Sequence, residues 1–219
     1  MLLSRLQSLI GGIYDVRVAY DVYDFLVTDR ARLPAAEHAG LAEEELIVAQ
    51  SADGAELGLS LYLDPALLER LAGSDPLIEL NSANVGDWWT ALEGVSHFLY
   101  LAWNAGHDKP VSLLELEMQA EVDKYVASYW LMRAQYPRHF PAELRRVLFE
   151  RTRIDPRLGG ERRGLYGEAN RYAARFCRRL ERRLAAAGAP AGEREVLAEL
   201  RRFYRLSNAR KRAHIERTS

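Results

Sequence analysis

The sequence is poor in the residues and runs that mark secreted or membrane-spanning chains. Its 219 residues include one cysteine, Cys177, which has no second cysteine with which to form a disulfide within the chain. No unbroken apolar run approaches the roughly 18 residues that a membrane-spanning helix needs. The apolar N-terminal stretch is interrupted by Arg5 and Gln7, so it does not match a signal peptide. We therefore expect a cytoplasmic globular protein.

Lysine is also scarce, and the charges are unevenly spread. Residues 1–132 carry 7 Lys or Arg and 21 Asp or Glu, a net charge of −14, whereas residues 133–219 carry 23 and 10, a net charge of +13. Such asymmetry is typical of chains that bind nucleic acid or another anionic partner. Two plainer interpretations stay open. The two stretches neutralise each other within one fold, or a GC-rich genome explains why 27 arginines stand against 3 lysines.

The strand signals lie in the first 65 residues. Segment 14–27 is rich in Val and Tyr, which predicts a strand or two. Segments 45–50 and 56–63 are apolar and flank a Ser-Ala-Asp-Gly sequence, and Asp-Gly is typical of hairpin turns because glycine accepts the positive φ that they need. Leucine recurs at every second position of the later segment, at Leu57, Leu59, Leu61 and Leu63. One face of that strand is therefore expected to be buried.

Elsewhere the pattern is helical. A short amphipathic helix is expected over 2–10, ended by Gly11 and Gly12, and a loop is expected over 30–42. After Asp64 the periodicity predicts helices over 65–71, about 84–104, 113–135, 141–150, 164–187 and 192 to near the C-terminus. Asp64, Ser112 and either Asn84 or Asp87 are residue types that cap helix N-termini, and Glu115 stands where a capping box has its glutamate.

These elements predict an α+β fold that is predominantly helical. A small N-terminal antiparallel β element should pack on a helical bundle formed by the rest of the chain. We expect a single domain over residues 1–219. It would comprise an acidic, β-containing portion (1–65), a helical core (66–150) and a basic helical C-terminal portion (164–219).

Two neighbouring helices carry acidic and histidine side chains at helical spacing. Glu93 and His97 are four residues apart, and so are Glu117 and Glu121, which places each pair on one helix face. Glu121 should lie at the edge of an apolar face, whereas Asp123 should point away from it. If the four side chains converged, they would suit a divalent metal, as in a metal-dependent hydrolase or oxidoreductase.

Ordinary pairing is the competing interpretation of the same four residues. Helical di-iron proteins space glutamate and histidine three apart rather than four, and the zinc motif His-Glu-x-x-His is absent. Glu93 and His97 would then form a simple pair, and Glu117 and Glu121 would contact arginines of the basic stretch. His38, His107 and His214 have no partner at a motif spacing.

One late helix divides its surface between apolar and basic residues. An apolar face is predicted at Leu165, Ala169, Tyr172, Phe176 and Leu180, with Cys177 at its margin as a half-buried residue. A separate face carries what we call the arginine stripe: Arg171, Arg175, Arg178 and Arg182. Guanidinium groups bind phosphate and carboxylate bidentately, so such a face suits an anionic partner.

These features favour a non-enzymatic binding or adaptor protein that contacts nucleic acid or an acidic protein surface through the arginine stripe. Three alternatives stay open. One is a metal-dependent enzyme built on the Glu/His residues. Another is a structural subunit of a homo-oligomer, for which Trp88, Trp89 and Trp103 offer apolar area. The third is that the stripe is an ordinary solvated helix face.

Overall fold

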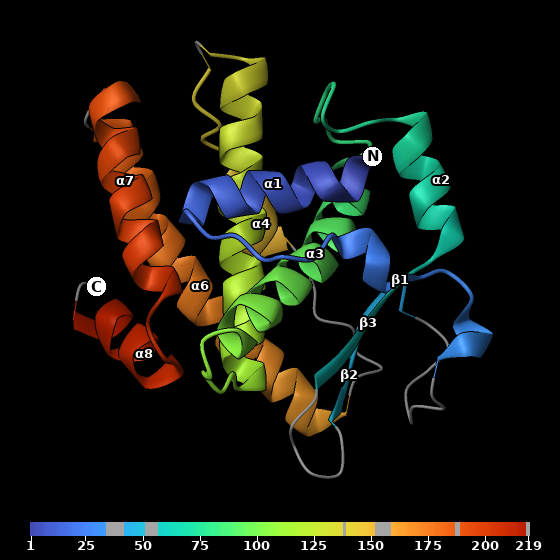
Figure 1. Ribbon diagram of the computed structural model, residues 1–219. Coiled ribbons are helices and arrows are strands. Elements are labelled where there is room, and N and C mark those ends of the chain that lie inside the picture. Colours follow the sequence, from blue (N-terminus) through green and yellow to red (C-terminus); the bar gives the residue numbers. More distant parts are fainter. Residues whose placement is uncertain (34–41, 51–56, 138, 152–158, 187–188, 218–219) are drawn as a thin grey trace. The chain divides into compact units, whose positions relative to one another are not determined.

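The fold is α+β and predominantly helical, as the sequence predicts (Figure 1). The computed structural model describes residues 1–33, 42–50, 57–137, 139–151, 159–186 and 189–217. The chain divides into two compact units, each of which is considered by itself. Unit 1 comprises residues 1–9 and 17–109, and unit 2 comprises residues 10–16 and 110–219. None of the described helices combines the length and apolar character required to cross a bilayer.

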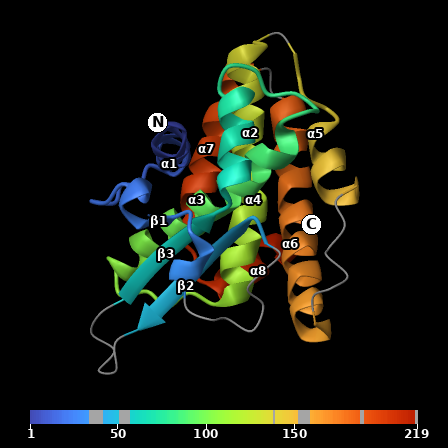
Figure 2. The same ribbon diagram turned by 90° about the vertical axis from the view of Figure 1, so that its right-hand side faces the viewer.

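Unit 1 contains a three-stranded sheet in the order β1-β3-β2 (Figure 2). Strands β2 (Glu44–Gln50) and β3 (Leu57–Leu63) pair antiparallel, with Leu46 opposite Leu61, which confirms the predicted hairpin strands. Its Asp-Gly turn lies outside the described residues. The two-residue strand β1 (Leu26–Val27) pairs parallel to β3, so the sheet is mixed rather than purely antiparallel.

The strand prediction for 14–27 is wrong over most of its length. Asp15 has a φ of 53°, which ends the preceding helix. Val22–Phe25 forms the 3₁₀ helix η1, because the side chain of Asp21 accepts a hydrogen bond from the backbone N–H of Tyr23 and caps it. Helix α1 (Leu2–Tyr14) also differs from its prediction, since it continues through Gly11 and Gly12. A second 3₁₀ helix, η2 (Arg30–Arg32), begins the segment expected to be a loop.

Helix α3 (Val85–Ala105) packs against the sheet of unit 1, and α2 (Pro65–Gly73) packs against α3. Asp64 caps α2 as predicted, since its carboxylate accepts from the N–H of Ala66 at 2.8 Å. A Cβ atom on Gly94 would stand only 2.7 Å from Leu61 Cδ1. Glycine at this position therefore allows α3 to approach the sheet closely. Leu61 is fully buried at this contact, and Trp88, Leu92, Val95 and Leu99 bury another face of α3.

Unit 2 is built from helices. The side chain of Ser112 caps α4, accepting from the N–H of Glu115 at 3.3 Å, while the carboxylate of Glu115 accepts from the N–H of Asn208. Helix α4 packs against α6, and α6 also contacts α7 and α8. Part of the helix predicted over 141–150 is a π-helical turn, η3. The bounds are α4 (Leu113–Gln135), α5 (Leu144–Arg146), η3 (Val147–Arg151), α6 (Gly160–Ala186), α7 (Ala189–Tyr204) and α8 (Asn208–Arg217).

Candidate functional site

The arginine stripe lies on the exposed face of α6. All four of its side chains are exposed, whereas Ala169, Phe176 and Leu180 on the apolar face are buried. Phe176 stacks on Phe203 of α7, with ring centroids 4.0 Å apart, and this contact fixes the rotation of α6 about its axis. Arg171 and Arg182 are 11 steps apart, so the stripe spans about 16 Å along the helix at 1.5 Å per residue. The stripe is thus a straight row of guanidinium groups.

Carboxylates near α6 are engaged by arginines that do not belong to the stripe. Arg179 Nη2 lies 2.5 Å from Glu199 Oε1, and Arg183 Nη1 lies 3.8 Å from Glu199 Oε2. Arg145 Nε donates to Glu181 Oε2 at 2.8 Å. Among the residues that the structure describes, no ion pair or side-chain hydrogen bond involves any of the four stripe arginines. Their positive charge is therefore not offset by a neighbouring carboxylate in the described part of the chain.

Two acids beside the start of the stripe, Glu168 on α6 and Glu216 on α8, contact residues of the other helix. Arg212 Nη2 lies 3.7 Å from Glu168 Oε1, and the hydroxyl of Tyr172 donates to Glu216 Oε1 at 3.0 Å. Arg212 Nε in turn donates to the Tyr172 hydroxyl oxygen at 3.0 Å. These contacts raise the pKa of Arg212, first through the hydrogen bond to Tyr172. Glu168 and Glu216 are thus tied into a contact between α6 and α8.

The unbalanced positive charge also acts on a neighbouring group. Burial lowers the pKa of Arg179, and the positive charges of Arg183 and Arg182 lower it further, against the opposing effect of Glu199. Arg182 belongs to the stripe. Burial is the largest cause of this shift, and the stripe contributes to it only through Arg182.

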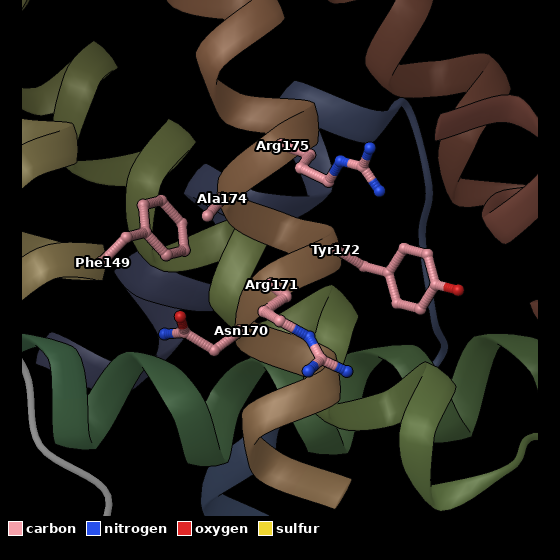
Figure 3. A pocket seen from close by; sticks show the side chains of 6 residues that line it. All are labelled: Phe149, Asn170, Arg171, Tyr172, Ala174 and Arg175. Carbon is pink, nitrogen blue, oxygen red and sulfur yellow. The ribbon is translucent and has the colours of Figure 1, made fainter. Parts of the chain in front are cut away.

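A pocket of about 590 Å³ adjoins the stripe in unit 2 (Figure 3). Arg171 and Arg175 project from successive turns of α6 and line it, and the ring of Phe149 stands beside Ala174. Phe149 is only 9% exposed and lies against Tyr125, with ring centroids 6.5 Å apart. Among the described residues, the lining is Phe149, Asn170, Arg171, Tyr172, Ala174 and Arg175. The pocket therefore joins cationic, amide and aromatic groups, a combination that no local spacing indicates because Phe149 comes from a separate helix.

The residues proposed as metal ligands divide between the two units. In unit 1, Glu93 is half-buried, and His97 is 5% exposed with its Nδ1 3.7 Å from Glu44 Oε1 on β2. In unit 2, Glu117 is buried, whereas Glu121 is half-buried and accepts from Lys124 Nζ at 2.6 Å. Glu121 therefore pairs with a lysine one turn away, and Glu117 is the more buried glutamate of the two. A metal site formed by these four residues stays a prediction.

Asp123 was expected to point away from the apolar face, and this expectation is wrong. Its side chain is buried and accepts hydrogen bonds from the Tyr14 hydroxyl and from Gln119 Nε2, the latter at 2.7 Å. Lys211 is completely buried, and its Nζ donates to Gln119 Oε1 at 2.5 Å. We call Tyr14, Gln119, Asp123 and Lys211 the buried polar network. These partners are up to 109 residues apart, so no local spacing indicates them.

His214 pairs with residues distant in sequence, and Cys177 differs from its predicted setting. His214 is 9% exposed, and its Nε2 lies 2.5 Å from Glu199 Oε1 and 2.8 Å from Arg179 Nη2. Cys177 is fully rather than half buried. Burial first, and then the charges of Glu121 and other acids, hold the pKa of its thiol well above the ordinary value. The thiol is consequently neutral and has the character of a packing residue rather than a nucleophile.

Two of the three tryptophans considered for oligomerisation are buried. Trp88 is completely buried and Trp103 is 8% exposed, whereas Trp89 is half-buried. Of these three residues only Trp89 presents appreciable area to a partner. A homo-oligomer stays a prediction.

The comparisons with known proteins return no relative. No protein-family model matches the chain, and searches of curated proteins and of solved structures find no match either. The geometry of α6 and its surroundings therefore carries the functional argument.

Proposed function

We propose that this chain is a non-enzymatic binding protein that contacts a polyanionic partner through the arginine stripe. One observation carries the proposal: Arg171, Arg175, Arg178 and Arg182 are exposed in a row, and no ion pair joins any of them to a described residue. A polyanion that meets such a row gains charge-assisted hydrogen bonds and releases counterions to bulk solvent.

The repulsion within the stripe supports a binding role over an ordinary solvated face. Its members follow one another at spacings of four, three and four residues, at which like charges on a helix repel by about 0.2–0.5 kcal/mol per pair. Arg145, Arg179 and Arg183 on and near the same helix each contact a glutamate. The fold thus pairs the arginines at helix junctions and leaves the aligned ones uncompensated, an arrangement that an anionic partner would stabilise.

The test is a charge-matched comparison. In one variant all four stripe arginines become glutamine. In the control, four exposed arginines elsewhere in unit 2 become glutamine: Arg162, Arg194, Arg202 and Arg210. Fluorescence anisotropy then measures binding to a labelled mixed-sequence oligonucleotide and to labelled poly-glutamate over a series of salt concentrations. We expect the stripe variant to lose at least tenfold in affinity and to show a shallower salt dependence, while the control retains most of its binding.

Two outcomes would contradict the proposal. One is equal weakening in both variants, which would indicate that net charge rather than the stripe attracts the probe. The other is an absence of binding by the unaltered protein at about 50 mM salt, where contacts to phosphates are strong. Circular dichroism of each variant confirms that the helices are retained.

A further inference from the structure

We infer that the partner is a single-stranded nucleic acid and that the pocket on α6 receives one of its bases. This inference rests on the proposed function, because it assigns phosphates to the arginine stripe. It adds a recognition element that a row of charges lacks. Arg171 and Arg175 belong to both features, so a strand that follows the stripe passes the mouth of the pocket.

The lining of the pocket suits a base beside a phosphate. Phe149 supplies an aromatic wall, Asn170 supplies an amide donor and acceptor, and the two guanidinium groups stand at the same pocket (Figure 3). Single-strand binders combine a basic track for the backbone with aromatic side chains that contact bases. A volume of about 590 Å³ lies within the roughly 300–1,000 Å³ usual for small-ligand pockets, so it accommodates one nucleotide.

The aromatic wall is held in place before any ligand arrives. Phe149 packs near Tyr125 of α4, and Arg145, which precedes it by about one turn, contacts both Glu150 and Glu181. The Glu181 contact ties this segment to α6. The wall and the stripe are thus joined, and little ordering entropy is lost when a base enters.

Other polyanions use only part of this arrangement. A duplex keeps its bases stacked and paired, so its phosphates would contact the stripe while the pocket stayed empty. An acidic protein surface would engage the guanidinium groups and make no use of the ring of Phe149. Only an unpaired strand presents phosphates and accessible bases together, and it occupies both features at once.

The experiment fills the pocket without altering charge. Ala174 is half-buried at the pocket, so Ala174→Trp occupies its space, and Ala198→Trp at an exposed position of α7 is the matched control. Anisotropy measures binding of a single-stranded oligonucleotide, the same strand with abasic residues, a duplex and poly-glutamate. We expect the protein to prefer the strand with bases over the abasic strand by roughly tenfold. Ala174→Trp should remove this preference while the affinity for duplex stays unchanged.

A second variant tests the same pocket in case Ala174→Trp alters the fold. Phe149→Leu retains an apolar side chain and removes the aromatic face, and it should also reduce the preference for bases. Equal affinity for the normal and abasic strands in the unaltered protein would overturn the inference and leave the proposed function standing. Tighter binding of poly-glutamate than of the single strand would overturn it in favour of an acidic protein partner. If the stripe variant bound every probe as well as the unaltered protein, the proposed function itself would fail.

Discussion

The two units accommodate charge in different ways. Unit 1 has 6 Lys or Arg against 16 Asp or Glu, a net charge of −10, and its arginines Arg5, Arg30 and Arg70 each contact a carboxylate. Unit 2 has 24 against 15, a net charge of +9. In each unit several groups of the minority charge form ion pairs with the excess charge, as Arg70 does in unit 1 and Glu199 does in unit 2. In unit 2 a part of that excess is aligned along a single exposed helix face, that of the arginine stripe.

The units also differ in what they bury. The clearest ionic contact of unit 1 is at its surface, where Arg70 Nη2 donates to Glu43 and Asp87 at 2.8 Å while 44% of its side chain is exposed. Unit 1 also buries His97 beside Glu44, whereas unit 2 buries both an acid and a lysine, Asp123 and Lys211, within the buried polar network. Interior polar groups are costly when unpaired, so the stability of unit 2 should respond strongly to protonation and to the loss of one partner.

Alkaline pH should produce the largest difference in stability between the two units. Burial, as the largest cause, holds the pKa values of Tyr14, Tyr125 and Tyr204 above 10, their ordinary value, and all three lie in unit 2. Above pH 10 the unfolded chain ionises these phenols and the folded chain does not, so stability falls as the pH rises. At about 1.4 kcal/mol per group per pH unit, the three contribute a loss of about 4 kcal/mol at pH 11. Cys177 acts with the same sign.

Hydrogen–deuterium exchange on protein equilibrated at alkaline pH, corrected for the intrinsic rate, measures this loss segment by segment. Protection should fall first in α4, α6 and α7, and last in the sheet of unit 1. Ultraviolet titration offers an independent check, because phenolate absorbs near 295 nm. Complete ionisation of all 11 tyrosines by pH 11 without any loss of structure would show that the buried phenols do not resist ionisation.

Removal of one buried acid should cost more than removal of a surface arginine. Asp123→Ala leaves the Tyr14 hydroxyl and the Gln119 amide without the carboxylate that they contact, and we expect a loss of about 3 kcal/mol in the free energy of unfolding. Arg70→Ala breaks an exposed contact to Glu43 and Asp87 and should cost about 1 kcal/mol or less. Urea denaturation of both variants measures the two losses, and similar values would contradict the contrast drawn between the units.

What the sequence reveals about this protein depends on how far apart the interacting residues are. The β2–β3 hairpin strands, the caps at Asp64 and Ser112 and the arginine stripe are local patterns, and each is where the sequence places it. The settings of Asp123 and His214 depend on side chains from other helices, so spacing along the chain could not indicate them. The pocket could not be predicted for the same reason, because Phe149 and the α6 residues that line it are distant in sequence.

Two predictions near the N-terminus are wrong: the end of α1 at Gly11 and the strand over 14–27. Burial and a local helix cap explain both. Leu3, Leu6, Ile10, Ile13 and Tyr14 are all buried, at a spacing that forms one helix face across Gly11 and Gly12. Burial of that face outweighs the cost of about 1 kcal/mol for each glycine in a helix interior. In segment 14–27 Tyr14, Val16 and Val22 are buried without forming a strand, and the cap at Asp21 selects a 3₁₀ turn.

The smallest predicted effect concerns how each unit brings its elements together. Unit 2 packs α6 on α7 through stacked aromatic rings, whereas unit 1 brings α3 to the sheet at Gly94. Gly94→Ala would press a methyl group against Leu61 Cδ1 and Glu44 Cγ, and because Leu61 is fully buried it has little room to move. We expect a net destabilisation of about 1–2 kcal/mol, since overpacking outweighs the gain in helix propensity.

Gly86→Ala on the same helix is the matched control. It has no atom within 4 Å of its added methyl and should be neutral or stabilising by up to about 1 kcal/mol. Thermal unfolding of the two variants compares them directly, and a stabilised Gly94→Ala would mean that α3 can move away from the sheet at little cost.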